Sequence, residues 1–418
     1  LGNGAQNGVY NGTASIISGG IVGKGVDVTP ANPLGGDVTV AGVLVTNNIS
    51  VEAWIKADTA TWTANGWGPN ARGANGFLIH PDLGNNTWRG FIVNNAGVFT
   101  QIGQVAAPII NDQYHHYAIT FDDATDTGRM YFDGVLVATN AGMALTRDAN
   151  AAITVVTGRD TAGATVDRRG DGQFDEVAIF NASLAGDRVK AHYMAGKGFT
   201  SFASASDLDL QGKFAYALNI GQGGSGSAGT VMGLEFTGDG VAGATVQAES
   251  TIFPAWGPKP EYGPDASNNA LENIMHSIRF DSNANAALPG ILVDLAVDVG
   301  ANYKLQLLFS ENGFTAPNNR TFDIEIEGAI IVNDGEVLAA TGGWSGNPTI
   351  GGVFTYEFIA TDSVLNIRLL NGGSLGNRDP ILNALTLENT TPTPEPASLA
   401  LLGMSAFALL RRRSHAAA

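Results

Sequence analysis

Short runs in which apolar and polar residues alternate recur along most of the chain, and this period of two restricts the possible folds more than any other feature. The clearest runs lie at residues 49–55, 117–121, 291–299, 303–309 and 322–327. Alternation places apolar side chains on one face of a strand and polar side chains on the other, as in antiparallel sheets with one face on a core. The sequence therefore predicts an all-β protein made of antiparallel β-sandwiches.

Turn signals separate these runs and locate one hairpin and one helix in the first half. Asp133 and Gly134 stand between two apolar segments, which predicts a type I′ hairpin turn because both positions need φ > 0. A single helix is expected over residues 183–195, with Ser183 as its cap and Gly196 as its stop.

Length and composition set the domain organisation and exclude several kinds of chemistry. The chain has 418 residues, which suggests two to four domains, and residues 196–208 are rich in Gly, Ser and Ala. We expect a first domain over 1–198, a linker over 199–208, a second domain over 209–389 and a tail over 390–418. The chain starts at Leu1 rather than methionine, so we expect that a segment precedes it.

The charge balance argues against nucleic acid as a partner. Lys+Arg 22 against Asp+Glu 39 gives 22 − 39 = −17, and an acidic surface repels phosphate backbones. The chain has no cysteine, which removes thiol nucleophiles, disulfides and thiolate metal sites.

The tail has an order of parts typical of a sorting signal. Pro394, Glu395 and Pro396 precede an apolar stretch over 397–410, and Arg411, Arg412 and Arg413 follow it. This stretch predicts a short C-terminal hydrophobic helix, shorter than the about 20 residues of a full membrane span. The arginines would remain on the cytoplasmic side. The alternative is a buried C-terminal helix.

This order resembles the PEP-CTERM sorting signal of Gram-negative bacteria. The resemblance implies export, transient retention in the inner membrane, processing near residues 394–396 by an exosortase-type enzyme, and a mature protein at the cell surface or in an extracellular matrix. Loss of residues 397–418 would remove three arginines and no acid, so the net charge would become −17 − 3 = −20.

The first half resembles the laminin-G-like, or concanavalin A-like, jelly roll of bacterial surface proteins. The resemblance is carried by ISVEAWIKA at 49–57, YHHYAITF at 114–121, MYFDGVLV at 130–137 and QFDEVAIFNASLAGDRVKAHYMAG at 173–196. It implies a jelly-roll sandwich but no particular ligand, because this fold serves many functions.

The second half resembles the malectin-like carbohydrate-binding domain, through segments at 217–239, 303–311, 319–328 and 379–388. The resemblance implies sugar binding by loops at one end of a sandwich. It places Asp379 at the acidic position before the last strand and Phe314 in the loop after the YKLQLLFSE strand. Three further loop aromatics are candidates by their character: Tyr262, Trp256 and Trp344.

The first half offers candidates for sugar and calcium binding. Trp62 and Trp67 lie in a loop rich in Gly and Asn, where aromatic rings could stack on sugars, and the alternative is that they cap the core. Asp122, Asp126 and Asp171 are calcium candidates in acidic loops, and a solvated turn is the alternative.

The sequence contains no convincing catalytic constellation. Asp323, Glu325 and Glu327 share one face of a strand, but the opposite face is apolar, so we interpret them as a solvated face. Glu52 has no second acid at strand spacing, and no Gly-x-Ser-x-Gly elbow is present.

The leading hypothesis is therefore a non-catalytic, exported protein that binds a polysaccharide or glycoconjugate, or mediates adhesion, through two β-sandwich modules. The alternative is a structural component of a surface matrix that makes protein contacts. A glycoside hydrolase is the third hypothesis. Calcium is the only cofactor that the sequence suggests.

Overall fold

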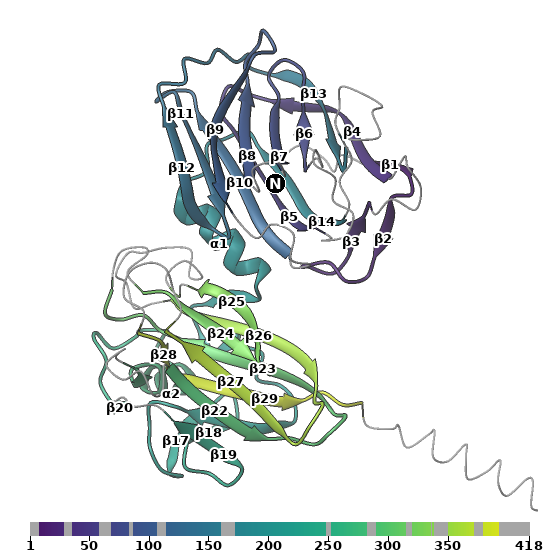
Figure 1. Cartoon of the computed structure of the whole chain (residues 1–418). Coiled ribbons are helices and arrows are strands. Elements are labelled where there is room, and N and C mark those ends of the chain that lie inside the picture. The colour runs from purple at the N-terminus through teal and green to yellow at the C-terminus, as the bar shows by residue number, and fades with distance from the viewer. Residues whose placement is uncertain are drawn as a thin grey trace, which may run out of the picture.

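The computed structural model describes residues 8–28, 36–57, 68–82, 87–106, 114–159, 172–247, 252–281, 290–314, 320–335, 337, 350–371 and 379–392, and the structural statements below concern these residues. The described chain is dominated by β-strands, which confirms the predicted all-β class. Figure 1 shows two β-rich bodies, the first formed by the N-terminal half and the second by the C-terminal half, with helix α1 (Gly186–Gly196) between them.

The first body is a sandwich of two sheets, each with seven described strands. The sheet that we call the β4 sheet contains, in spatial order, β1 (Val9–Gly12), β4 (Gly36–Val45), β13 (Ala151–Thr157), β6 (Asn70–Ala71), β7 (Phe77–Asp82), β8 (Thr87–Val93) and β9 (Phe99–Ala106). The facing sheet, called the β5 sheet, contains β12 (Val135–Ala141), β11 (Thr127–Phe132), β10 (Tyr114–Asp122), β5 (Ile49–Ala57), β14 (Gly172–Phe180), β3 (Gly25–Asp27) and β2 (Ser15–Ile17).

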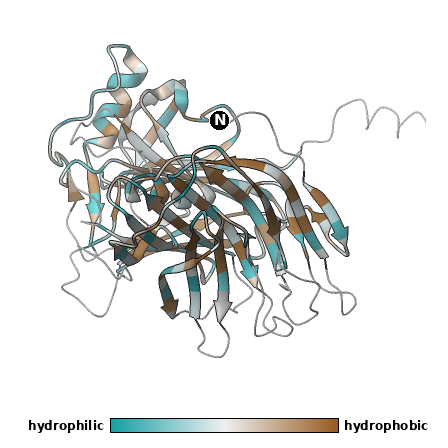
Figure 2. Cartoon of the chain, turned by 90° about the horizontal axis from the view of Figure 1, so that it is seen from above, coloured by the Kyte–Doolittle hydropathy of each residue, from teal (hydrophilic) through white to brown (hydrophobic). Residues whose placement is uncertain are grey.

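Alternation decides which side chains fill the first core. Ile49, Val51 and Ile55 of β5 point into the sandwich and are buried against residues such as Phe77 and Trp88 of the β4 sheet. Bands of opposite hydropathy follow one another along several strands in Figure 2. The burial of these alternate residues supplies the hydrophobic contribution to folding of this body.

The predicted hairpin is confirmed. Asp133 and Gly134 have φ of 48° and 73°, and they connect β11 to β12 with Phe132 paired to Val135. These positive φ values are those that a type I′ turn requires.

Helix α1 starts later than predicted. Ser183 does not cap it, because the residue before the first helical residue is Ala185, which makes no side-chain cap. The Ser50 hydroxyl of β5 donates to Ala182 O and accepts from Leu184 N, at 2.7 Å and 2.8 Å. This pair of bonds holds the segment against the sheet in a non-helical conformation, and the helix can begin only after it.

The second body is also a sandwich. Its larger sheet, called the β23 sheet, contains β15 (Phe199–Phe202), β26 (Gly351–Ile359), β23 (Asn302–Phe309), β29 (Ala384–Asn389), β16 (Phe214–Asn219), β18 (Leu234–Gly238) and β17 (Ser227–Val231). The facing sheet contains β19 (Ala244–Gln247), β22 (Gly290–Ala296), β27 (Val364–Leu370), β24 (Phe322–Ile326) and β25 (Ala329–Gly335). A small sheet at one end contains β20 (Ile252–Phe253), β21 (Ile278–Phe280) and β28 (Ile381–Leu382).

Two features of the second body depart from the expectation of a purely antiparallel, helix-free sandwich. The β16 and β18 strands pair in parallel. Helix α2 (Ala266–Met275) is capped by Asp265, whose side chain accepts a hydrogen bond from Asn268 N, and the helix buries Leu271, Ile274 and Met275. These three residues follow the i, i+3, i+4 spacing of a helix, so the signal was present but short.

The predicted linker over 199–208 is wrong for most of its length. Phe199–Phe202 form β15, which pairs with β26 of the second body, and both phenylalanines are buried. Residues Ala205–Asp207 then form a 3-10 helix with a capping box between Ser204 and Asp207. Small residues flank the two phenylalanines in the sequence, so the segment resembles a linker. It forms a strand because it pairs with β26, which is distant in the sequence.

Helix α1 joins the two bodies through a continuous apolar cluster. Trp54 of β5 points out of the first sandwich and stacks on Tyr193 of α1, with ring centroids 5.6 Å apart. Tyr193 and Met194 are fully buried in the same cluster as Phe199 and the core of the second sandwich. Gly196 permits this contact, because a Cβ there would lie 2.4 Å from the Trp54 indole. We call this set of contacts the joint.

Candidate functional site

Loops from distant parts of the chain meet beside the small end sheet of the second sandwich. They are the loop after β20, the loop after β23, the residues just before β24 and the residues just before β28. Because β20, β21 and β28 are hydrogen-bonded neighbours, the loops at their ends are brought to one place. We call the residues that meet there the Arg320 cluster: Trp256, Glu311, Phe314, Arg320 and Asp379.

Arg320 is the centre of this cluster. Its guanidinium carbon lies 4.9 Å from the centroid of the Phe314 ring and 5.7 Å from that of the Trp256 ring. Arg320 Nη1 donates to Asp379 O at 2.6 Å. A buried cation over two aromatic faces is a favourable cation–π arrangement, and it orients both rings.

Glu311 fixes the arginine and the loop together. One of its carboxylate oxygens lies 2.5 Å from Arg320 Nε, and the other accepts from Gly313 N and Phe314 N at 2.9 Å and 3.0 Å. The Arg320 and Glu311 side chains are only 6 % and 2 % exposed. A carboxylate with this many donors is a rigid anchor, because buried charges are stable only when they are paired.

The loop after β20 is interlocked with the loop after β23. Asn312 Nδ2 donates to Trp256 O at 3.1 Å, and a Cβ at Gly313 would lie 2.5 Å from the Trp256 ring. Trp256 and Phe314 are both half-buried residues. The arrangement offers two oriented aromatic rings with the acidic residue Asp379 beside them, which suits stacking on a sugar face combined with hydrogen bonds to hydroxyl groups.

The structure brings together three of the predicted ligand residues, Trp256, Phe314 and Asp379. Arg320 was missed, although it lies in the segment 319–328 that carries the malectin-like resemblance. No local pattern marks it, since its importance comes from contacts with Trp256 and Asp379, which are 320 − 256 = 64 and 59 positions away. Trp344, Trp62 and Trp67 lie outside the described residues.

Tyr262 does not belong to the exposed part of the site. It is 5 % exposed and packs against Phe202, with ring centroids 5.3 Å apart, in the core that also holds helix α2. Burial raises the pKa of Tyr262. The prediction of a loop aromatic that faces a ligand is therefore wrong for this residue, because its loop folds back over the core.

The carboxylates of Asp122 and Asp126 in the acidic loop at 122–126 accept hydrogen bonds from backbone N–H groups. Asp122 Oδ1 accepts from Ala124 N at 3.0 Å, and the two carboxylate oxygens of Asp126 accept from Ala144 N at 2.5 Å and Leu145 N at 3.2 Å. Among the described residues, no group of three or more acidic or histidine side chains is arranged to hold a metal ion. Asp171, the third calcium candidate, lies outside the described residues.

We expect Asp126→Ala to lower the stability of the protein by about 1–3 kcal/mol, because two backbone N–H groups would lose their acceptor. Asp126 also has φ of 49°, which a non-glycine residue other than Asn or Asp adopts less readily. Thermal unfolding of the wild type and the variant, each with calcium and with a chelator, measures the effect. A stabilisation by calcium that disappears in the variant would contradict a purely structural role.

The three acids of β24 and of the turn that follows it lie in different environments. Register shifts interrupt the pairing of β24 with β25 on either side of Ile324, and Glu327 lies in the turn that follows β24, with φ of 53°. The Glu327 carboxylate accepts from Asn366 N at 2.6 Å. Asp323 is buried and Glu325 is only half-buried, so the three acids do not share one solvated face as predicted.

Glu52 has two histidine neighbours that the sequence did not reveal. Its carboxylate lies 2.9 Å from His192 Nδ1 of α1 and 3.6 Å from His116 Nε2 of β10. Glu176 of β14, at a register shift with φ of 46°, lines the same cavity of about 420 Å³. His192 is hydrogen-bonded to Glu52, and the same cavity is lined by Trp54 and Gly196, so this group of residues lies at the edge of the joint.

The fold and the cluster define a two-sandwich, all-β protein with an aromatic loop site, and comparisons with protein families agree with this class. Residues 33–190 match the concanavalin A-like lectin/glucanases superfamily, residues 293–385 match the malectin domain, and residues 392–414 match the PEP-CTERM protein-sorting motif. The three predicted families are thus confirmed, in the predicted order. The malectin match contains Phe314, Arg320 and Asp379, whereas Trp256 precedes it.

Similar solved structures are distant. Domain 4 of AbnA, an extracellular arabinanase from Geobacillus stearothermophilus, is 18% identical, with 44% of this chain and 86% of that chain covered and a TM-score of 0.34. The plant receptor-like kinase ANX2 is 12% identical, with 94% and 92% covered and a TM-score of 0.34. Similarities this low carry no argument about function. A search of curated protein sequences found no match.

The family matches indicate an exported surface protein with domains of carbohydrate-binding type. The sorting motif indicates that an exosortase processes a membrane-anchored precursor. The tail that carries Pro394, Glu395, Pro396 and the arginines lies outside the described residues. Within the part of the chain that the structure describes, no helix has the length and apolar character needed to cross a membrane.

Proposed function

We propose that this protein is a non-catalytic carbohydrate-binding or adhesion protein, displayed at the surface or in the extracellular matrix of a Gram-negative bacterium, and that the Arg320 cluster binds the sugar. The observation that carries the proposal is the pair of half-buried rings, Trp256 and Phe314, held over one buried arginine beside Asp379. The malectin match over this region supports it.

Binding at one such site would be weak, because a few stacked rings and hydrogen bonds supply little free energy beyond the cost of ordering the sugar. A second module on the same chain can compensate when the ligand is a polymer, since the second contact becomes intramolecular. A polysaccharide is therefore a better partner than a small free sugar.

We expect Phe314→Ala and Asp379→Ala to weaken polysaccharide binding about tenfold or more, which corresponds to about 1.4 kcal/mol. Affinity electrophoresis of the full chain in gels with a broad set of neutral polysaccharides measures the effect. Ile359→Ala, an exposed apolar residue of the same sandwich, is the matched control and should bind as the wild type does.

Two other results would change the proposal. If no polysaccharide retards the wild type, or if Phe314→Ala and Ile359→Ala bind equally well, the cluster is not a sugar site and a structural matrix component becomes the better hypothesis. Release of reducing sugar that disappears in Glu325→Gln would instead support a glycoside hydrolase.

A further inference from the structure

The first sandwich has a cavity between its two sheets, where β4 faces β14. Its volume is about 400 Å³, which lies within the range of small-molecule sites. The two sheets form opposite walls, with Val40, Val43 and Val155 on the β4 sheet and Val26 and Ile179 on the β5 sheet. Four of these residues belong to the first core or pack against it, so the cavity continues that core toward the edge of the sandwich.

Short side chains and limited strand pairing keep this edge open. Six of the lining residues are valines, which reach less far across the gap of about 10 Å between two packed sheets than leucine or phenylalanine would. In the described part of the chain, β1 pairs with β4 only over 36–39, and β3 pairs with β14 only at Gln173 and Phe174. Figure 1 shows β1, β2 and β3 at the same side of the first body. The remaining lengths of β4 and β14 therefore leave the gap between the sheets accessible from this side.

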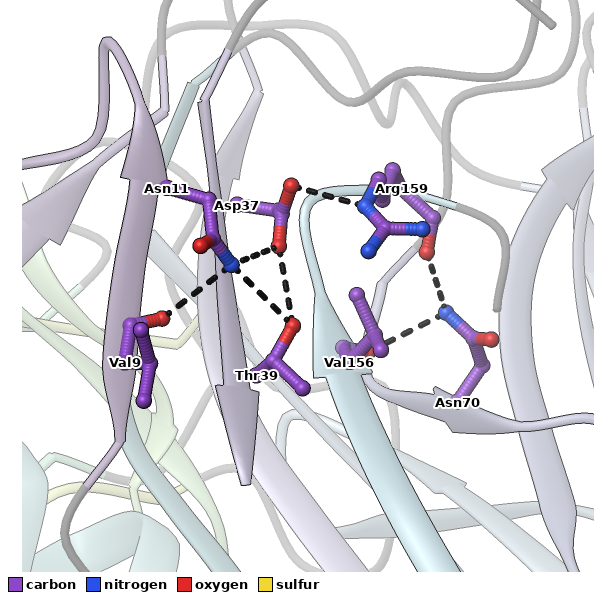
Figure 3. Close-up of polar contacts among 7 residues, drawn as sticks. All are labelled: Val9, Asn11, Asp37, Thr39, Asn70, Val156 and Arg159. Carbon is purple, nitrogen blue, oxygen red and sulfur yellow. Dashed lines mark hydrogen bonds and ion pairs between the residues drawn. The ribbon is translucent and has the colours of Figure 1, made fainter. Parts of the chain in front are cut away.

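The β4 wall of the cavity is held from its outer face, as Figure 3 shows. Asp37 accepts from Asn11 Nδ2 of β1 at 2.8 Å and from Arg159 Nε at 2.7 Å. Asn70 Nδ2 of β6 donates to Val156 O of β13 and to Arg159 O, at 3.1 Å and 2.6 Å. These bonds tie β1, β4, β13 and β6 together, so the wall resists collapse into the cavity. A ligand that enters a preformed cavity loses less free energy to rearrangement of the protein.

A β-bulge in β14 forms the rim of the cavity. The pairing of β14 with β5 shifts between Asp175 and Ala178, and Glu176 has φ of 46° there. Bulges bend a strand and change the direction of its side chains, and they are common beside functional sites. Glu176 and Val177 are both exposed and both line the cavity, so the cavity reaches solvent at the bulge.

The two charged residues of the lining, Asp175 and Glu176, are both acidic. The Asp175 carboxylate accepts from Val22 N and Glu176 N at 3.0 Å and 2.9 Å, and these neutral donors leave its negative charge in place. Neither acid forms an ion pair with a residue that the structure describes. Partial burial, and then the charges of Asp175 and Glu52, raise the pKa of Glu176. The rim therefore disfavours a further anion and favours a cation.

An apolar cavity with an acidic rim suits a ligand that has an apolar body and a positively charged head. We propose that this cavity binds a small amphiphilic amine, with its alkyl chain between the valine-lined walls and its ammonium group at the rim beside Glu176. A fatty carboxylate would bring an anion to the same acids and should bind less tightly. The proposal goes beyond the proposed function and does not depend on sugar binding at the Arg320 cluster.

The test is isothermal titration calorimetry of the full chain at pH 7 with three eight-carbon probes: octylammonium, octanol and octanoate. The amine is charged at this pH, because alkylamines titrate at about pH 10, as lysine does. We expect octylammonium to bind about tenfold more tightly than octanoate, with octanol between them.

Val40→Trp tests the position of the alkyl chain. The indole would fill part of the cavity, so binding of all three probes should weaken about tenfold. Leu44→Trp is the matched control, because it adds the same ring to the same strand at a position that is 54% exposed. It should bind the probes as the wild type does.

Glu176→Gln tests the position of the ammonium group. It keeps the size of the side chain at an exposed position, so it remains informative even if Val40→Trp does not fold. Binding of octylammonium should weaken about tenfold, whereas binding of octanol should not change. Glu357→Gln removes an equal charge from an exposed position of β26 and should have no effect.

The proposal is overturned if octylammonium does not bind the wild type, if Val40→Trp and Leu44→Trp bind it equally, or if Glu176→Gln and Glu357→Gln bind it equally. Phe314→Ala separates this proposal from the proposed function. It should weaken binding of polysaccharide at the Arg320 cluster and leave the binding of octylammonium unchanged.

Discussion

Replacement of Arg320 by alanine is expected to cost about 3 kcal/mol of stability and to abolish binding at the Arg320 cluster. The Glu311 side chain is 2 % exposed, and removal of its cation leaves a buried charge whose remaining donors are backbone N–H groups. Breaking one side of a buried ion pair typically costs about 3–5 kcal/mol. The Trp256 and Phe314 rings would also lose the cation that orients them.

Three variants separate charge from geometry in this prediction. Arg320→Lys keeps the charge but lacks the planar fork that contacts Glu311 and Asp379 together, so it should recover part of the stability and little of the binding. Arg368→Ala removes a more exposed ion pair with Asp294 and should cost less than about 1 kcal/mol. Urea unfolding followed by circular dichroism measures all of them. Equal losses for Arg320→Ala and Arg368→Ala would refute the central role of Arg320.

Acid is expected to weaken the joint through Glu52. Burial by itself would raise the pKa of Glu52, but hydrogen bonds from His116 and His192 and their positive charge outweigh burial and lower the pKa from 4.5 to about 2. The folded-state pKa is thus below that of the unfolded chain. The contribution of Glu52 to stability is therefore present above about pH 4.5 and is lost as the pH falls toward 2, and it amounts to about 3 kcal/mol at most.

The Glu52→Gln variant tests this pH dependence. It should be less stable than the wild type at pH 6, and it should lose less stability between pH 5 and pH 3, because it has no carboxylate to protonate. Glu357→Gln, at an exposed position of β26, serves as the control and should follow the wild type. Thermal unfolding at each pH measures the effect, and a parallel loss of stability in Glu52→Gln and the wild type would be the contrary result.

The candidate site was only partly predictable from the sequence. Asp379 and Phe314 were found through a family resemblance, and Trp256 through its character as a loop aromatic. Arg320, which organises them, gave no local signal, because an arginine before a strand is common on protein surfaces. Tyr262 and Trp256 are both loop aromatics in the sequence, yet Tyr262 is buried in the core whereas Trp256 is half-buried. Only the packing of helix α2 under its loop separates the two residues.

The sequence alone determined the β-class, the hairpin at Asp133 and Gly134, and the three families in their order, because alternation, turn chemistry and motifs are local properties of the chain. The tertiary structure decided where distant segments meet. It made residues 199–202 a strand of the second sandwich, placed Trp54 against Tyr193 in the joint, and put Arg320 against Glu311 and Asp379. The physical reason is that alternation fixes the face on which a side chain lies, whereas its neighbours on that face depend on which strands pair and in which register.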